Sequence, residues 1–449
     1  MDNAVLMNIF KAYDIRGKVG TELTEELAER IGRAMAAWLP AEGAVAVGRD
    51  MRPDSEALSQ ALASGLMAAG RDVVNIGQVT SDMIYHAVGK HGLAGGAMIT
   101  ASHNPGKDNG IKLCREEAKP ISIESGLADI RDMVQSEFLD AEQPGTSSTL
   151  DVTNEWIDHV LSFVDTSKLT PLKLAVDAGN GMAGAIFPSL EKRVPWEVTE
   201  LYFELDGTFP NHEANPLKFE TLADLIKTIK ENGLDGGIAF DGDGDRAFVI
   251  DETGVPLTGG VMSAMMSEYF LGKYEGASIV YDARNSHSVI DVIKQKGGRP
   301  VRSRVGHSLI KEKMREVDAP FGGEASGHFY FKDNWYADSG IIGAVIGLYV
   351  ATLSGKKLSE LREQYTLYNA IPEKNFEVSD KQAAIDRLKE AFAQDEQDTL
   401  DGLTVQLPNN SWFNVRPSNT EPLLRLNAEA TNQSDLDALV DKVVSIITK

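Results

Sequence analysis

The apolar positions near the start of the chain first follow the period of a helix and then form a short continuous run. Leu27, Ile31 and Met35 fall on one helix face, and Thr24 can cap the beginning of that helix. The run at 44–47, AVAV, is typical of a short buried strand. This part of the chain therefore predicts a helix followed by a strand.

The following segments continue this alternation. The pattern over 55–70 predicts a helix that ends at a glycine, and VVNIG at 73–77 predicts another strand. Alternating helices and strands indicate an α/β architecture, in which functional loops often follow the carboxyl ends of strands. The stretch TASHNP at 100–105 follows the apolar run 96–99. We therefore expect Ser102 to lie exposed at the end of a strand.

One phrase, Gly-Leu-x-Gly-Gly followed by an apolar run and a polar loop, occurs twice. Residues 92–105 read GLAGGAMITASHNP, and residues 233–246 read GLDGGIAFDGDGDR. A weaker echo, Phe-Gly-Gly at 321–323, precedes GEASGH. Self-similarity of this kind predicts three related α/β units, each with one functional loop. Chance similarity is the alternative interpretation.

Two polar segments, 141–151 and 251–260, are predicted to be linkers. After about Leu361 the sequence holds no long apolar strand until the short runs LTVQL and LLRLNAE, which predicts a smaller α+β unit. The predicted fold class is therefore α/β, with three related α/β domains and a smaller α+β C-terminal domain. The expected domain ranges are 1–147, 148–253, 254–362 and 363–449.

Composition narrows the class of protein further. A chain of 449 residues is too long for one hydrophobic core, and its formal charge of −23 argues against a nucleic-acid or membrane-surface partner. A single cysteine, Cys114, and the lack of an export signal at the N-terminus favour the cytoplasm. The most apolar segment, Ile341–Leu353, is shorter than the roughly 20 residues of a membrane span, so we expect a buried helix.

The loop DGDGDR carries three carboxylates that alternate with glycine. Asp241, Asp243 and Asp245 can converge on one cation, and hard oxygen donors suit Mg²⁺ or Ca²⁺. An EF-hand is an alternative, because Glu252 is the twelfth residue counted from Asp241. Arg246 at the sixth position and strand-like flanks oppose it. A solvated acidic loop without a metal is a further alternative.

Ser102 in TASHNP has several possible roles. It could cap a turn, or, close to a divalent cation and cationic side chains, it could carry a phosphoryl group. A Ser-His-Asp hydrolase is less consistent with the sequence, because the G-x-S-x-G motif is absent and His103 is the immediate neighbour of the serine. The phosphoryl carrier would place Ser102 and DGDGDR in one site.

Two further loops offer ligands for a phosphorylated sugar, although RPSNTEP could also be an ordinary surface turn. RPSNTEP combines a guanidinium with hydroxyl and amide groups that suit a phosphate dianion: Arg416, Ser418, Asn419 and Thr420. GEASGH contains Glu324 and Ser326, which can bond vicinal hydroxyls, and His328, which can exchange a proton.

Taken together, KAYDIRG, TASHNP, DGDGDR, GEASGH and RPSNTEP resemble the α-D-phosphohexomutase superfamily, closest to its phosphomannomutase/phosphoglucomutase branch. The motifs occur in the order of that family and span nearly the whole chain. The resemblance implies four domains around a central cleft, each with one loop in it. It also implies reversible phosphoryl transfer between the 1- and 6-positions of glucose or mannose phosphates, with Mg²⁺ and a hexose 1,6-bisphosphate intermediate.

The same resemblance implies a role for each matched residue. Ser102 would carry the phosphoryl group and bind Mg²⁺ with Asp241, Asp243 and Asp245. The other residues with an implied catalytic role are Arg16, Lys112, Arg246 and His328, of which Lys112 and His328 would carry protons. The implied substrate-binding residues are Tyr13, His103, Arg284, His307, Glu324, Ser326, Arg416, Ser418, Asn419, Thr420 and Arg425.

Two departures from the family pattern affect these expectations. Arg284 stands where many relatives have lysine, so its contact with phosphate can be bidentate. Ala325 differs from the glutamine typical of phosphoglucosamine mutases, which favours sugars without an amino group. The alternatives are a phosphoglucosamine mutase, a metal-dependent phosphatase and a cation-binding module without activity. We expect a monomer or a weak homodimer.

Overall fold

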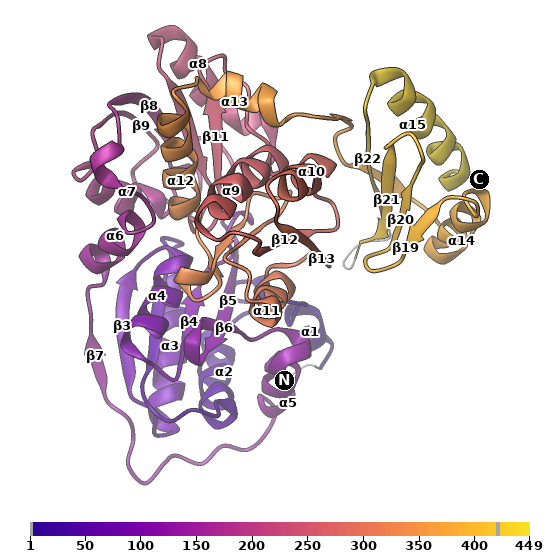
Figure 1. Cartoon of the computed structure of the whole chain (residues 1–449). Helices are drawn as coiled ribbons and strands as arrows, with labels where there is room; N and C mark the ends of the chain where they lie inside the picture. Colours follow the sequence, from indigo (N-terminus) through magenta and orange to yellow (C-terminus); the bar gives the residue numbers. More distant parts are fainter. Residues whose placement is uncertain (1–2, 419–422) are drawn as a thin grey trace.

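The computed structural model describes residues 3–418 and 423–449, and its strands form four separate sheets. Three sheets follow one another along the first four-fifths of the chain, and the last belongs to a smaller unit set to one side (Figure 1). The fold class predicted from the sequence, three α/β domains and a smaller α+β domain, is confirmed.

The first domain is a mixed sheet with helices packed against it. Its strands are β1 (Ile15–Lys18), β2 (Val45–Arg49), β3 (Val73–Gln78), β4 (Gly95–Ile99), β5 (Asp108–Arg115), β6 (Lys119–Pro120) and β7 (Ser147–Thr149). Its helices are α1 (Asn3–Ile9), α2 (Glu25–Trp38), α3 (Ser55–Ala68), α4 (Ser81–His91) and α5 (Ala128–Met133). Thr24 caps α2 as predicted, since its hydroxyl accepts a hydrogen bond from the Leu27 amide.

The second and third domains are built in the same way. The second contains β8 (Leu172–Asp177), β9 (Trp196–Leu201), β10 (Gly236–Phe240), β11 (Ala247–Asp251), α6 (Thr153–Leu161), α7 (Ala183–Glu191) and α8 (Ala223–Asn232). The strands of the third are β12 (Ser278–Asp282), β13 (Arg299–Ser303), β14 (Phe321–Gly323), β15 (Phe329–Phe331) and β16 (Ala337–Asp338). Its helices are α9 (Gly259–Lys273), α10 (His287–Gln295), α11 (His307–Val317), α12 (Gly340–Ser354) and α13 (Leu358–Tyr365).

The strand order confirms that the repeated phrase marks related units. The orders β5-β4-β2-β3, β11-β10-β8-β9 and β15-β14-β12-β13 occur in the three sheets. In each, the strand of the repeat (β4, β10 or β14) pairs parallel with one neighbour and antiparallel with the strand that follows it. The loops TASHNP, DGDGDR and GEASGH therefore occupy the same connection in three copies of one motif.

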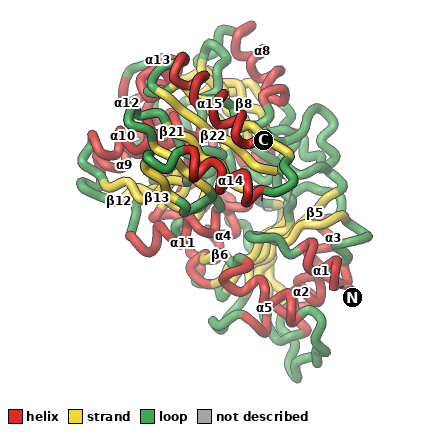
Figure 2. The backbone as a smooth tube through the Cα atoms, turned by 90° about the vertical axis from the view of Figure 1, so that its right-hand side faces the viewer, coloured by secondary structure: helices red, strands yellow, loops and turns green. Residues whose placement is uncertain are grey.

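The C-terminal unit is an antiparallel sheet covered by two helices. Its elements are β17 (Asn369–Ala370), β18 (Lys374–Glu377), β19 (Glu396–Asp398), β20 (Leu403–Gln406), β21 (Trp412–Pro417), β22 (Leu423–Ala430), α14 (Lys381–Ala391) and α15 (Gln433–Ile447). Residues of both helices share one apolar cluster with β20, β21 and β22, so the helices close one face of the sheet (Figure 2).

Three details differ from the sequence expectations or complete them. The segment 141–151, expected as a linker, contributes β7, which pairs parallel with β3. Strand β21 was not predicted from the sequence, although Asn414 and Arg416 alternate with the apolar Phe413 and Val415. The buried helix expected at Ile341–Leu353 is confirmed as α12.

Within the described part of the chain no single helix is long and apolar enough to span a membrane, although α12 and α13, bent by 96°, pass that test together.

Candidate active site

A cavity of about 570 Å³ lies where the first three domains meet. Its walls come from the N-terminal segment, the two loops that follow β4 and β10, the start of α11 and the residue before β15. Nine of the residues singled out from the sequence line it: Tyr13, Arg16, Ser102, His103, Lys112, Asp245, Arg246, His307 and His328. The structure thus brings residues from three domains to one place.

Ser102 follows β4, as predicted, but it is buried rather than exposed. Its relative accessibility is 4 %, because the loop between β10 and β11 packs directly on it. A Cβ on Gly242 would lie 2.5 Å from the Ser102 carbonyl oxygen, so only glycine allows this approach. The Ser102 hydroxyl donates a hydrogen bond of 2.8 Å to Asp241 Oδ2. The serine therefore points into the acidic loop.

The backbone around Ser102 is held in a conformation that non-glycine residues rarely adopt. Ser102 has φ +51°, and strained backbone of this kind persists only when surrounding contacts fix it. Arg52 supplies those contacts: its guanidinium donates to the carbonyl oxygens of Ser102, Asn104, Pro105 and Asp108. Sequence reasoning missed Arg52, since nothing in its surrounding sequence points to a loop 50 residues away.

The three aspartates of DGDGDR converge as predicted. One carboxylate oxygen from each of Asp241, Asp243 and Asp245 lies within 4.8 Å of the others, and all three residues are buried. Asp243 Oδ1 has no hydrogen-bond partner among the described residues, which leaves a buried oxygen available to a cation. This set of hard oxygen donors fits a divalent cation such as Mg²⁺.

The EF-hand interpretation is excluded. The loop is flanked by β10 and β11, which pair antiparallel, instead of two helices. Glu252, the twelfth residue counted from Asp241, accepts hydrogen bonds from the amide and hydroxyl of Ser359 and takes no part in the loop.

Two basic residues balance the acidic loop. Lys112 Nζ lies 2.6 Å from Asp243 Oδ2 and 2.5 Å from Asp245 Oδ2, and Arg246 forms a 2.8 Å ion pair with Asp241. Burial alone would lower the pKa of Lys112, but Asp243 and Asp245 raise it well above its usual value. Lys112 therefore stays charged at neutral pH. Burial raises the pKa of Asp241 to about 7, against the opposing effect of Arg246.

Arg16 and His103 complete this side of the cavity. Arg16 donates to the Asn104 side chain at 2.7 Å and to the Ala101 carbonyl at 3.1 Å, so it is anchored on the serine loop. His103 Nδ1 lies 2.5 Å from Arg246 Nη2. Burial and the nearby Arg246 and Arg16 lower the pKa of His103 far below its usual value. His103 is therefore neutral and accepts from a guanidinium, which does not suit a base for Ser102.

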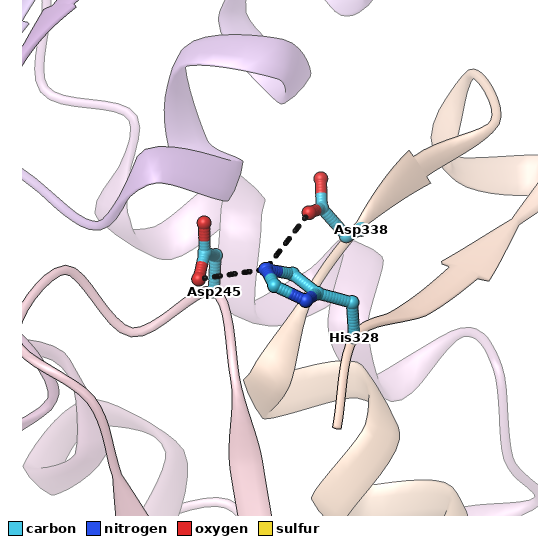
Figure 3. Close-up of side chains that lie close together, drawn as sticks. All are labelled: Asp245, His328 and Asp338. Atoms are coloured by element: carbon cyan, nitrogen blue, oxygen red, sulfur yellow. Dashed lines mark ion pairs between the residues drawn. The ribbon is translucent and has the colours of Figure 1, made fainter. Parts of the chain in front are cut away.

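The loop GEASGH places a histidine between carboxylates. Ser326 donates to Glu324 Oε2 at 2.7 Å, and His328 Nδ1 lies 3.4 Å from the same oxygen. His328 Nε2 lies 3.5 Å from Asp245 Oδ1, across the boundary between domains (Figure 3). Burial lowers the pKa of His328, but Asp245 and Glu324 outweigh it and raise the pKa to about 10. His328 is therefore protonated at neutral pH.

Tyr13 and His307 form a contact between the N-terminal segment and the third domain. Their rings meet edge to face with centroids 5.4 Å apart, and the Tyr13 hydroxyl donates to the Val305 carbonyl oxygen at 2.8 Å. Burial lowers the pKa of His307 to about 4, so this imidazole is neutral. It lies at the first residue of α11.

Arg284, Arg416, Ser418 and Arg425 are not among the residues that line the cavity. Arg284, after β12, pairs with Asp282 at 2.9 Å, and Asp282 Oδ1 accepts from the Ala325 amide of GEASGH. In the C-terminal unit Arg416 and Arg425 both face Glu373, at 3.7 and 3.3 Å. Lys381 donates to the Ser418 carbonyl oxygen. Asn419 and Thr420 lie outside the described residues.

The structure also reveals a clamp on the acidic loop that sequence reasoning missed. Ser81, the first residue of α4, donates its hydroxyl to Asp243 Oδ2 at 2.5 Å and its amide to the Asp243 carbonyl oxygen at 3.0 Å. Its neighbour Asp82 accepts from Ser339 Oγ at 2.5 Å, and Ser339 caps α12. One signal was available, because Ser81 closely follows β3, whose carboxyl end lies at the same edge of the sheet as that of β4.

Comparison with known proteins identifies the architecture. Family models described as phosphoglucomutase/phosphomannomutase α/β/α domains I, II and III match residues 7–140, 154–254 and 258–368. The model of the C-terminal domain of the same family matches residues 373–446. The four matched segments follow one another in the order of the four sheets.

Individual relatives match over nearly the full length. A phosphomannomutase of Vibrio cholerae is 41% identical over 459 residues, covering 99% of both chains, and phosphohexose mutases of Xanthomonas campestris are 43% identical over 433 residues, covering 95% of this chain and 96% of theirs. A crystal structure of a phosphoglucomutase/phosphomannomutase family protein from Burkholderia thailandensis superposes with a TM-score of 0.90 at 34% identity, covering 98% of this chain and 97% of that one. The chain therefore belongs to the phosphoglucomutase/phosphomannomutase family.

Proposed function

We propose that this phosphosugar mutase interconverts the 1- and 6-phosphates of mannose, glucose or both through a phosphoserine at Ser102 and a hexose 1,6-bisphosphate. The observation that carries the proposal is the position of the Ser102 hydroxyl. It lies 2.8 Å from Asp241, next to three converging carboxylates, and lines a cavity of about 570 Å³. A cavity of that size suits a phosphorylated sugar.

Mg²⁺ would be held by Asp241, Asp243 and Asp245 together with Ser102. The unpartnered oxygen of Asp243 and the burial of all three carboxylates support this assignment. When bound, a divalent cation neutralises charge that develops on a transferring phosphoryl group. The clamp from Ser81 fixes Asp243, so the donors are oriented before any substrate arrives.

Protein cations would neutralise the remaining phosphate charge. Arg246, Lys112 and Arg16 all line the cavity within reach of the serine loop. The two guanidinium groups are held by Asp241 and Asp14, at 2.8 Å in each case, which keeps their planes fixed. Fixed donors of this kind stabilise a transition state without having to reorganise during the reaction.

The chemical step would break one P–O bond and form another. The Ser102 Oγ–P bond breaks while the sugar O6 attacks phosphorus, so the O6 proton must be accepted and Ser102 Oγ must gain one. Lys112 and His328 are the proposed proton carriers, because both line the cavity. Both are protonated at neutral pH, so either can donate to Ser102 Oγ, whereas the one that accepts the O6 proton must first have lost its own. The bisphosphate then rotates so that its 1-phosphate faces Ser102. In the reverse transfer Ser102 Oγ attacks this phosphorus and the bond to O1 breaks, which restores phosphoserine. No water or nucleotide is consumed.

Binding of the sugar and of its distal phosphate is assigned to the third and fourth domains. Glu324 and Ser326 would bond two hydroxyl groups of the hexose. Arg284, Arg416, Ser418 and Arg425, together with Asn419 and Thr420, would grip the phosphate that does not react. The Arg416 Nε group is buried and makes no hydrogen bond within the described residues, so a donor is available for an anion.

Labelling tests the phosphoserine directly. The protein is incubated with glucose 1,6-bisphosphate and examined by intact mass and peptide mapping, with Ser102→Ala as the test variant and the exposed Ser445→Ala as the matched control. We expect one phosphate on Ser102 in the wild type and the control, and nearly complete loss of mutase activity in Ser102→Ala. Stoichiometric label on another serine would contradict the proposal.

Substrate assays distinguish the alternatives. Coupled assays with glucose, mannose and glucosamine 1-phosphates should show turnover of the first two, because Glu324 and Ser326 leave the 2-position weakly sensed. Comparable or better kcat/KM for glucosamine 1-phosphate would indicate a phosphoglucosamine mutase instead. Release of inorganic phosphate equal to substrate consumed would indicate a phosphatase. The cytoplasmic location, the monomeric or weakly dimeric state and the domain boundaries stay predictions.

A further inference from the structure

A second cluster of potential metal ligands lies beside the acidic loop (Figure 3). It consists of Asp245 from the loop between β10 and β11, His328 immediately before β15, and Asp338 at the end of β16. One donor atom from each residue lies within 4.8 Å of the others. Two domains therefore bring an imidazole and two carboxylates to one point, with Asp245 shared between this cluster and the acidic loop.

The distances suit a small tetrahedral cation. His328 Nε2 lies 3.5 Å from Asp245 Oδ1 and 3.9 Å from Asp338 Oδ2. Around a tetrahedral zinc ion with bonds of about 2.1 Å, neighbouring donor atoms stand about 3.4 Å apart. The two separations that involve His328 are thus close to that value, and the two carboxylates, which lie within 4.8 Å of each other, would approach by up to about 1.4 Å.

One of the donors is buried without a hydrogen bond. The Asp245 side chain is 5% exposed, and its Oδ1 atom makes no hydrogen bond to any described residue. Its contacts are longer ion pairs, 3.5 Å to His328 and 3.9 Å to Arg246. The oxygen is thus oriented toward His328 and available to a ligand.

One oxygen of the Asp338 carboxylate is held by Lys311. Lys311, which is fully buried, lies 2.7 Å from Asp338 Oδ1 and above the ring of Tyr85, with Nζ 4.0 Å from the ring centroid. The other oxygen, Oδ2, is left facing His328. Lys311 therefore fixes the direction of this donor and compensates its charge when no cation is bound.

We propose that Asp245, His328 and Asp338 form a second cation site that prefers Zn²⁺ and similar transition-metal ions over Mg²⁺, and that filling this site inhibits the mutase. An imidazole nitrogen is a good ligand for Zn²⁺, whereas Mg²⁺ favours oxygen donors. Asp245 and His328 line the central cavity, which gives an ion a route in and leaves room for water as a further ligand. Asp245 belongs to both sets of donors, so the two sites would be adjacent.

The inhibition rests on the proposed function, because a cation on His328 Nε2 removes one of the two proposed proton carriers. Binding itself does not depend on that function. Nε2 has a single lone pair, so it cannot bind a cation and hold a proton at the same time.

Binding is tested on the whole chain in excess Mg²⁺. The protein is titrated with Zn²⁺ by calorimetry and with Co²⁺ by visible absorbance, which reports coordination geometry. The test variants are Asp338→Asn and, in case the first does not fold, His328→Gln. The matched control is Asp251→Asn, a buried carboxylate at the far end of β11 that pairs with Arg362. We expect one additional ion per chain in the wild type and the control, and at least tenfold weaker binding in each test variant.

Wild-type affinity in Asp338→Asn, or displacement of Zn²⁺ by rising Mg²⁺ with simple one-site competition, would overturn the second site. Activity at saturating Mg²⁺ separates the two proposals. If Zn²⁺ binds as expected but turnover continues, the inhibition and the proton-carrier role of His328 are both wrong. If no additional ion binds while Ser102 is still labelled by the bisphosphate, the second site fails and the proposed function stands.

Discussion

Replacing Lys112 by methionine should destabilise the protein strongly in the absence of a divalent cation. The Lys112 ammonium lies 2.6 Å from Asp243 and 2.5 Å from Asp245, and the exposed fractions of the three side chains are 8%, 0% and 5%. Methionine preserves most of the side-chain volume, so the main loss is the charge. Breaking a buried ion pair by removing one partner costs about 3–5 kcal/mol, because the other partner keeps its charge without compensation.

The measurement is urea unfolding followed by tryptophan fluorescence, in EDTA and in Mg²⁺, with the m-value checked to be constant. Lys168→Met is the control, since Lys168 is 59% exposed and faces an exposed Asp165; its effect should stay within about 0.5 kcal/mol. In EDTA the free energy of unfolding of Lys112→Met should be about 3–5 kcal/mol lower than that of the wild type. In Mg²⁺ the difference in unfolding free energy between the wild type and this variant should be smaller, because the cation neutralises the carboxylates in place of the ammonium and no longer competes with it.

The pH dependence of this difference follows from the pKa shift. The pKa of Lys112 is raised in the folded state, so its contribution is complete below the unfolded value of about 10.5 and is lost only as pH rises through the folded value. The difference in unfolding free energy between the wild type and Lys112→Met in EDTA should therefore not change between about pH 6 and 9. A loss no larger than that of Lys168→Met, or a gap that Mg²⁺ leaves unchanged, would refute the reasoning.

Three further predictions test other parts of the site. In Gly306→Ala a methyl carbon would lie 2.3 Å from the Tyr13 hydroxyl oxygen at φ +137°, so kcat/KM should fall at least tenfold in a steady-state assay; full activity would show that the loop can shift freely. Arg416→Ala should weaken glucose 1-phosphate and glucose 6-phosphate alike, by about 1.5–3 kcal/mol each in calorimetry on unphosphorylated protein; loss for one ligand alone would mean separate phosphate sites. Burial lowers the pKa of His86 to about 3, so the folded state holds His86 neutral while the unfolded state takes up a proton below about pH 6.5. The free energy of unfolding should therefore fall by about 2 kcal/mol between about pH 6.5 and 5, and His86→Leu should remove most of that fall in urea titrations. An unchanged pH dependence in the variant would contradict the assignment.

Much of the fold was predictable because its signals are local. The helix face that includes Leu27 and Ile31, the cap at Thr24 and the apolar runs before the loops are all set by neighbours a few positions away. The repeated Gly-Leu-x-Gly-Gly phrase then identified equivalent strands, and their common topology confirmed it. Strand β21 was not predicted, although its apolar and polar residues alternate and Phe413 and Val415 lie in the core of the C-terminal unit.

The chemistry of the site was partly local as well. Three aspartates separated by single glycines can meet in one loop whatever the rest of the chain does, and their convergence was foreseen. The burial of Ser102 could not be foreseen, because it depends on Gly242 of the next domain packing against the serine loop. The exposed serine expected from a strand end was therefore wrong.

The contacts that orient the site were decided by tertiary structure alone. Ser81 and Asp243 are 162 positions apart, and Asp82 and Ser339 are 257 apart. Asp338 comes close to His328 only because β16 pairs with β15, where Asp338 lies opposite Tyr330. Such contacts depend on how whole domains dock, and docking is determined by extended surfaces with no short-range signature in the sequence. The amino-acid sequence alone thus determined the loops and their donor groups, whereas the packing of the first three domains determined which donors face one another.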